Sequence, residues 1–87
     1  MTHLIVEQTF ETPLTDEEHG RLGQRLDQCL EAHGARWVRS YLSTDRRRMV
    51  CEFEAADAES VRASYRSAGL WFDRVWAAEL YARETTV

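Results

Sequence analysis

Apolar and polar residues alternate along three segments of the chain, and this two-residue period predicts β-strands. The first segment covers His3–Phe10. The second, Arg36–Ala55, has the form of a β-hairpin with its turn at Ser43–Arg48. The third is Asp73–Tyr81, which we expect to be an edge strand, and we expect the last residues, 83–87, to be a frayed tail.

Two further segments have helical spacing of their apolar residues, and we expect helices over Asp16–His33 and Ala58–Ala68. Each is preceded by a residue that can cap a helix N-terminus and followed by a glycine that can end the helix in a left-handed conformation. These residues are Thr15 and Asp57, and Gly34 and Gly69.

The resulting order β-α-β-β-α-β predicts an α+β domain of the ferredoxin-like class, with a four-stranded antiparallel sheet in a single domain over 1–87. Right-handed crossovers place both helices on one face of the sheet and leave the other face bare. We expect that face to pair with a second copy of the chain, as a dimeric α+β barrel, because it is too apolar to remain in water. Its expected residues are Ile5, Glu7, Trp37, Tyr41 and Val50.

The two faces of the predicted hairpin differ in chemistry. If Leu42 lies opposite Met49, then Ser40 faces Cys51 and Val38 faces Phe53, which makes one face apolar. The other face carries the polar and aromatic residues, which we take as the candidate site. They are Trp37, Arg39 and Tyr41 on one strand and Val50, Glu52 and Glu54 on the other.

Charge and composition exclude several classes of function. A net charge of −4 and a pI near 5.3 argue against a nucleic-acid partner. The run Arg46–Arg48 is expected to be an exposed turn kept soluble by its charge. The chain has no lysine, so Schiff-base chemistry is excluded. Cys29 and Cys51 lack metal or redox spacing and are expected in the core.

The chain shows no signal-peptide pattern and no apolar run long enough for a membrane span. We therefore expect a cytoplasmic protein that has no membrane partner. No sequence pattern of a hydrolase triad, a phosphate-binding loop or a zinc protease is present, so we expect no cofactor.

Several side chains of the candidate site have two interpretations each. Arg39 opposite Glu52 is either a solvated ion pair or an anchor for an anionic or carbonyl ligand. Tyr41 either donates a hydrogen bond to an enolate or phenolate or is an interface aromatic. Trp71 and Phe72 are either core residues or an aromatic wall beside a flat ligand.

The carboxylates Glu7, Glu52 and Glu54 are candidate general bases. His3 alternates onto the same strand face as Glu7. These two residues are therefore the ligands we would expect if a metal ion is bound at all.

Short motifs spread over most of the chain resemble a family of small bacterial ferredoxin-like proteins that are described as nickel-binding. The resemblance implies nickel as the ion. In that family a His precedes the Ser-Tyr pair and another lies in the second helix, where this chain has Arg39 and Ser64. The family prefers Pro-Val where this chain has Trp71-Phe72. The matching residues are Val6-Glu7, Trp37 with Ser40-Tyr41, Cys51 with Phe53-Glu54-Ala55, Arg62, Ala68-Gly69-Leu70 and Asp73-Arg74-Val75.

Three hypotheses of function follow. The first is a homodimer that binds a small aromatic or polyketide-like molecule of secondary metabolism, acting as a cofactor-free isomerase or cyclase. In it Glu7 or Glu52 moves a proton, Arg39 and Tyr41 stabilise an oxyanion, and pocket walls bind the substrate. The wall residues are Trp37, Val50, Glu54, Trp71 and Phe72. The alternative is a nickel-binding protein of metal homeostasis, and the third hypothesis is an oligomerisation module.

Overall fold

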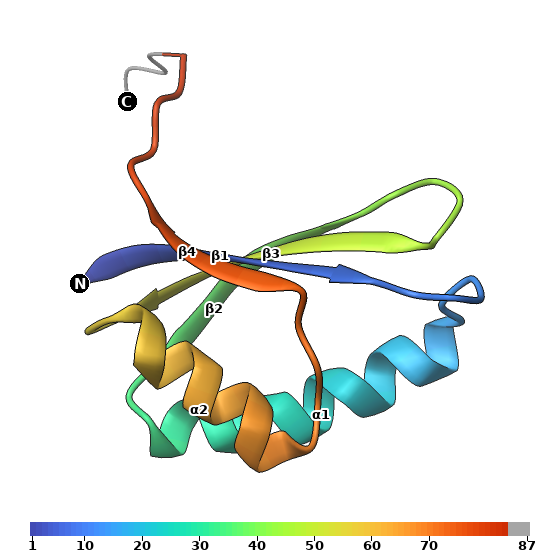
Figure 1. Ribbon diagram of the computed structural model, residues 1–87, viewed down its shortest axis with the longest axis horizontal. Helices are drawn as coiled ribbons and strands as arrows, with labels where there is room; N and C mark the ends of the chain where they lie inside the picture. Colours follow the sequence, from blue (N-terminus) through green and yellow to red (C-terminus); the bar gives the residue numbers. More distant parts are fainter. Residues whose placement is uncertain (84–87) are drawn as a thin grey trace.

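Six elements follow one another in the predicted β-α-β-β-α-β order, in a computed structural model that describes residues 1–83 (Figure 1). Of the tail predicted at 83–87, only Arg83 lies within the described residues. The elements are β1 (Thr2–Thr9), α1 (Asp16–Ala32), β2 (Arg36–Leu42), β3 (Arg48–Ala55), α2 (Ala58–Ala68) and β4 (Arg74–Ala78).

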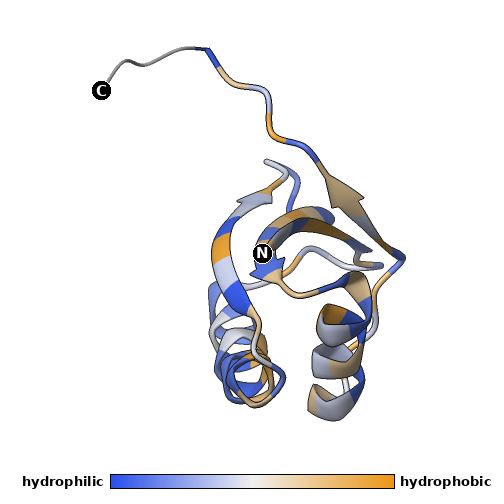
Figure 2. Cartoon of the chain, turned by 90° about the vertical axis from the view of Figure 1, so that its left-hand side faces the viewer, coloured by the Kyte–Doolittle hydropathy of each residue, from blue (hydrophilic) through white to orange (hydrophobic). Residues whose placement is uncertain are grey.

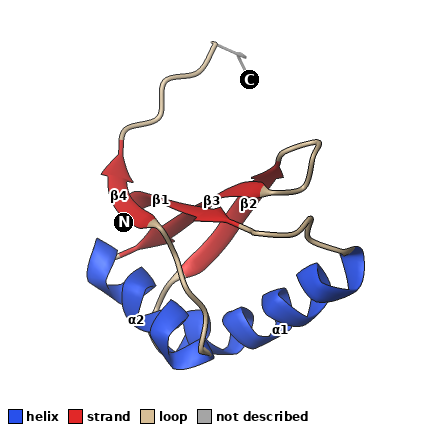
Figure 3. Cartoon of the chain, turned by 45° about the vertical axis from the view of Figure 1, so that its right-hand side comes forward, coloured by secondary structure: helices blue, strands red, loops and turns tan. Residues whose placement is uncertain are grey.

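The four strands form one antiparallel sheet in the order β2-β3-β1-β4. Both helices lie side by side on the same face of this sheet, and the opposite face, called here the open face, carries no helix (Figures 1 and 2). The predicted ferredoxin-like architecture is confirmed. Sheet, helices and connecting loops can be followed in Figure 3.

Strand β4 is an edge strand, as expected, but it ends at Ala78 rather than at Tyr81. It hydrogen-bonds only to β1, and Ala78 is already opposite His3, close to the first residue of that strand. Residues 79–83 belong to no strand and lead away from the sheet (Figure 1).

The capping residues predicted from the sequence are found at the helix ends. Glu18 N–H donates to Thr15 Oγ1 (3.1 Å) and Thr15 N–H donates to Glu18 Oε1 (3.0 Å), which completes a capping box. The backbone N–H and the hydroxyl of Thr15 both donate to the Glu18 carboxylate, and these two hydrogen bonds hold the pKa of Glu18 below its usual range. Gly34 and Gly69 have φ angles of 69° and 73°, the left-handed conformation that glycine adopts at low cost.

The core lies between the sheet and the two helices. Its fully buried residues include Leu4 and Val6 from β1, Phe53 from β3, and Val61 and Tyr65 from α2. Phe53 and Tyr65 pack edge to face, with ring centroids 6.0 Å apart. Cys51 is buried and Cys29 is half-buried against this core, as predicted for both cysteines.

The arginines of the hairpin turn do more than keep that turn soluble. Arg46 Nη2 contacts Asp16 Oδ1 at 2.7 Å, and Arg47 donates to the carbonyl of Glu11. Backbone hydrogen bonds from Phe10 N–H and Leu14 N–H join the same two segments. The turn between β2 and β3 is thereby fastened to the loop between β1 and α1.

Within residues 1–83 no helix is long and apolar enough to cross a lipid bilayer.

Candidate functional site

Most of the predicted hairpin register is confirmed. Leu42 pairs with Met49 and Ser40 with Cys51 on the side of the helices. Arg39 pairs with Glu52, and Tyr41 with Val50, on the open face. The alternation predicted from the sequence therefore places Arg39, Tyr41 and Glu52 together on the open face.

Trp37 was predicted on this face, and that prediction is wrong. An irregularity between Trp37 and Arg39 shifts the register, so that Trp37 rather than Val38 is opposite Phe53. The extra residue of a β-bulge reverses the side to which every earlier side chain of the strand points. Trp37 thus lies on the helix side, where its Nε1–H donates to Ser40 Oγ (2.8 Å).

Glu52 is the centre of a polar cluster on the open face. Its side chain is only 12% exposed, and its Oε1 lies 2.7 Å from Arg39 Nε. Its other oxygen, Oε2, lies 3.9 Å from His3 Nε2 on the neighbouring strand β1. Arg39, Glu52 and His3 thus form a row across three strands of the sheet.

His3 has an unusual environment within this row. Its Nε2 atom is buried and has no hydrogen-bond partner among the described residues. The separation from Glu52 Oε2 is too long for a hydrogen bond. A buried nitrogen without a partner loses its hydration without compensation, so it marks a place where a proton or a ligand would be favourable.

The other carboxylates of the open face also have partners. Glu54 contacts Arg36, which is opposite it on β2, and the hydrogen bond and charge of Arg36 hold the pKa of Glu54 below its usual range. Glu7 Oε2 accepts a hydrogen bond from Trp76 Nε1 (2.8 Å). A carboxylate that already accepts such a hydrogen bond is less available as a general base.

His3 and Glu7 do not form the metal-ligand pair that the sequence suggested. They are four residues apart on one strand, about 13 Å along it. The structure instead places Glu52 beside His3, because β1 and β3 are neighbours in the sheet. Cross-strand neighbours of this kind cannot be found from the spacing within one strand.

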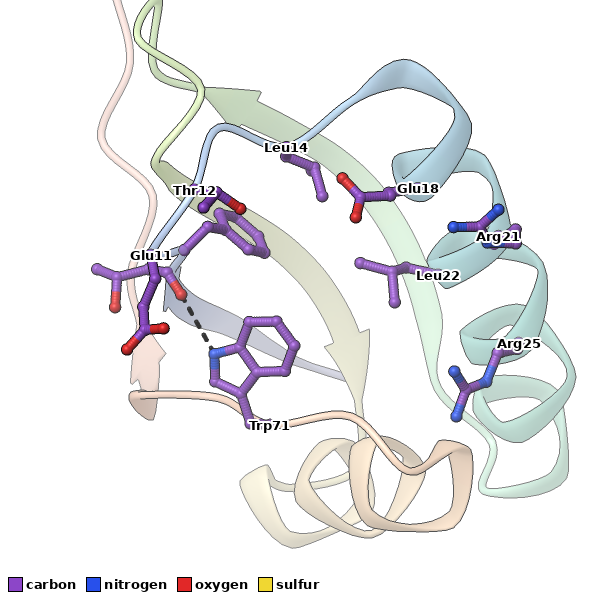
Figure 4. Close-up of a pocket in the computed structure, with 10 residues that line it drawn as sticks. Glu11, Thr12, Leu14, Glu18, Arg21, Leu22, Arg25 and Trp71 are labelled. Carbon is purple, nitrogen blue, oxygen red and sulfur yellow. Dashed lines mark hydrogen bonds between the residues drawn. The ribbon is translucent and has the colours of Figure 1, made fainter.

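Trp71 and Phe72 lie on the other side of the sheet from Arg39 and Glu52. Phe72 packs edge to face on Tyr65, with centroids 5.8 Å apart, as a partly buried core residue. Trp71 lines a cavity of about 700 Å³ between α1 and the loop after β1 (Figure 4). The predicted site residues therefore divide into two groups. Glu7, Arg39, Tyr41, Val50, Glu52 and Glu54 face away from the helices, and Trp37, Trp71 and Phe72 lie on their side.

Trp76 is a residue of the open face that sequence reasoning did not assign to the site. Trp76 is opposite Ile5 on the neighbouring strand β1. Trp76 is 45% exposed, whereas Ile5 is only 8% exposed. The alternation of β4 placed Trp76 on one side of its strand. The sequence did not show that this side is the open face, because that depends on which strand β4 pairs with.

The open face provides few donors for a metal ion. Imidazole nitrogen suits nickel, and His3 Nε2 is such a nitrogen without a partner. Glu52 Oε2 is the second donor, but the guanidinium of Arg39 lies on the same carboxylate and repels a cation. In residues 1–83 no three His, Cys, Asp or Glu side chains gather in a group that could hold a metal. One chain therefore supplies two donors of suitable chemistry, which is half of a four-coordinate donor set.

Comparison with known proteins gives the family of the chain. No curated protein sequence matches it. The crystal structure of SCO4226 from Streptomyces coelicolor A3(2) superimposes with a TM-score of 0.82 at 16% sequence identity, covering 92% of this chain and 99% of that one. At this identity the likeness shows a shared fold. A family described as nickel responsive protein SCO4226-like matches residues 4–77, and the chain therefore belongs to this nickel-responsive family.

Proposed function

We propose that the protein is a nickel-binding member of its family and that His3 and Glu52 on the open face hold the ion. The observation that carries the proposal is the buried His3 Nε2, without a hydrogen-bond partner among residues 1–83 and 3.9 Å from Glu52 Oε2. The name of the family, nickel responsive, supports nickel as the ion.

Two donors from one chain are too few for tight binding, so the proposal includes a homodimer that pairs through the open face. Trp76 and Tyr41 are 45% and 56% exposed on this face, which is a large apolar area to leave in water. A two-fold axis through the face would bring two copies of the His3 and Glu52 pair into one interface. The two copies together then supply four donors.

Calorimetric titration of tag-free protein with nickel chloride tests this proposal. We expect saturable binding that weakens at least fivefold, by about 1 kcal/mol or more, in His3→Ala, because the imidazole is the better of the two donors. His33→Ala is the matched control, since His33 lies at the end of α1 and contacts Ser67 instead. That variant should bind nickel like the unchanged protein.

Sedimentation velocity of the same samples at micromolar concentration should show a dimer, and Trp76→Glu should shift it towards monomer. If the protein were a monomer under all conditions, no partner subunit would supply the other two donors, and the dimeric site would be rejected. The absence of saturable nickel binding, or an equal loss in His3→Ala and His33→Ala, would reject the nickel proposal.

A second candidate function is a cofactor-free isomerase or cyclase that acts on an aromatic or polyketide-like substrate. The observation that favours it is that Arg39 and Tyr41 project from the same face of β2 beside the nearly buried Glu52. In this mechanism Glu52 or Glu7 transfers a proton while Arg39 and Tyr41 stabilise the developing oxyanion. We rank it second because both carboxylates already have partners, Arg39 and Trp76.

Incubation with a panel of aromatic and polyketide-like ketones, followed by mass spectrometry and proton exchange, tests the second candidate. Conversion by the unchanged protein should fall at least 100-fold in Arg39→Ala, which is the scale of losing an oxyanion donor. No conversion of any ketone, or full conversion by Arg39→Ala, speaks against this function.

A further inference from the structure

Helix α1 does not close tightly onto the sheet along its first half. Leu30 near its C-terminus is buried, whereas Leu22 and Leu26 are only half-buried. Two cavities, of about 700 and 310 Å³, border α1, and Leu22 lines both. The larger cavity, called here the α1 cleft, has the size that small organic molecules occupy.

One wall of the α1 cleft is aromatic and held in place. Trp71 and Phe10 pack edge to face with ring centroids 5.5 Å apart. Trp71 Nε1 donates to the carbonyl of Thr9 (3.3 Å), and the carbonyl of Trp71 accepts from the buried Gln8 Nε2 (2.9 Å). The backbone and the indole of Trp71 are thereby both held in place, yet the residue remains 48% exposed. A fixed ring of this kind is a stacking surface for a flat ligand.

The facing wall carries two guanidinium groups. Arg21 and Arg25 lie one helical turn apart on α1, across the cleft from Trp71 (Figure 4). Arg25 Nη2 donates to the carbonyl of Ala68, which sets the orientation of its guanidinium. Of the two lining carboxylates, Glu18 is held by Thr15 in the capping box, and Glu11 lies on the far side of Trp71 in the same view. Arg21 also lies 3.6 Å from Glu17, and the two guanidinium groups and two carboxylates that line the cleft carry no net charge together. The charged groups of the wall opposite Trp71 are the two arginines.

Two glycines of α1 leave room in the smaller cavity. Gly20 and Gly23 both line it, and a Cβ added to either would meet no described atom within 4 Å. A glycine inside a helix lowers stability by about 0.5–1 kcal/mol relative to alanine. The chain thus tolerates this cost twice on the side of the helix that borders the smaller cavity.

We propose that the α1 cleft binds a flat aromatic organic anion. The aromatic body lies between Trp71 and Leu22, and the anionic group is bound by Arg21 and Arg25, whose planar donors suit carboxylates and sulfonates. The cleft and the nickel site are on opposite sides of the sheet. A negative result for one proposal therefore does not contradict the other.

Fluorescence titration with 8-anilinonaphthalene-1-sulfonate tests the proposal, with the uncharged N-phenyl-1-naphthylamine as comparison. We expect one anion per chain, bound more tightly than the uncharged probe. Arg21→Gln should weaken the anion about fivefold and leave the uncharged probe unchanged, because it removes one charge-assisted contact. Arg66→Gln, on the exposed side of α2, is the matched charge control and should change neither.

A second pair of variants tests the position of the site. Trp71→Ala should weaken the binding of both probes because it removes the stacking surface, whereas Gln28→Phe, on a side of α1 that does not line either cavity, should leave them bound. His3→Ala should also leave them bound. Equal affinity for the anion and the uncharged probe, or unchanged binding by Trp71→Ala in protein that still melts cooperatively, would overturn the proposal.

Discussion

Replacing Phe53 with alanine is expected to lower the free energy of unfolding by about 3–5 kcal/mol, the cost of truncating a large aromatic residue in a packed core. Phe53 is fully buried on the central strand β3 and packs edge to face on Tyr65, which is itself 1% exposed. A domain of 87 residues has a total stability of roughly 4–13 kcal/mol. The variant should therefore lose a large part of its stability.

Urea titration followed by circular dichroism at 25 °C measures this loss. Tyr81→Ala is the matched control, because Tyr81 is an aromatic residue that is 87% exposed beyond the end of β4. Its substitution should change the free energy of unfolding by no more than about 0.5 kcal/mol. A loss below about 1 kcal/mol in Phe53→Ala would mean that β3 and α2 do not enclose this ring as described.

The hairpin shows how far sequence alternation predicts structure and where it stops. Between Leu42 and Arg39 each side chain lies on the predicted face, because a strand alternates strictly as long as its ladder is regular. At Val38 one extra residue enters the ladder, and Trp37 lies on the opposite face. Nothing in the alternation of Arg36–Leu42 marks that position, since a bulge depends on the pairing with β3 rather than on β2 alone.

Helix α1 shows a different limit. Its helical spacing correctly placed Leu22, Leu26 and Leu30 on one side, and its caps were predicted to within one residue. Spacing reports which residues share a side, but it does not report how closely that side approaches a sheet. The structure shows Leu22 and Leu26 only half-buried, beside the two cavities that border this helix.

The centre of the open face could be predicted only in part. The opposition of Arg39 and Glu52 follows from the hairpin, whose strands are adjacent in sequence. The approach of His3 to Glu52 depends on the pairing of β1 with β3, which are separated by a helix and a strand. The chain offered both residues as candidates, but only the order of the strands puts them together.

Replacing Arg39 with histidine is expected to raise the affinity for nickel roughly 30-fold, which corresponds to about 2 kcal/mol. The substitution removes a guanidinium whose Nε lies 2.7 Å from Glu52 Oε1, so the carboxylate no longer has a competing cation. It also puts an imidazole opposite Glu52, on the side away from His3. Two imidazoles and one carboxylate are a donor set that suits nickel better than the present pair.

The two contributions can be separated by comparing Arg39→His with Arg39→Gln in calorimetric titrations. Glutamine removes the charge without adding an imidazole, so its affinity should lie between that of the unchanged protein and that of Arg39→His. Arg36→His is the positional control, because Arg36 is opposite Glu54 rather than Glu52, and we expect a much smaller gain. If Arg39→His bound nickel no better than Arg39→Gln, the added imidazole would not reach the ion, and Glu52 would not be a ligand on this face. A gain in Arg39→His that disappears in the double variant with His3→Ala would instead place the ion between β1 and β2, on Glu52.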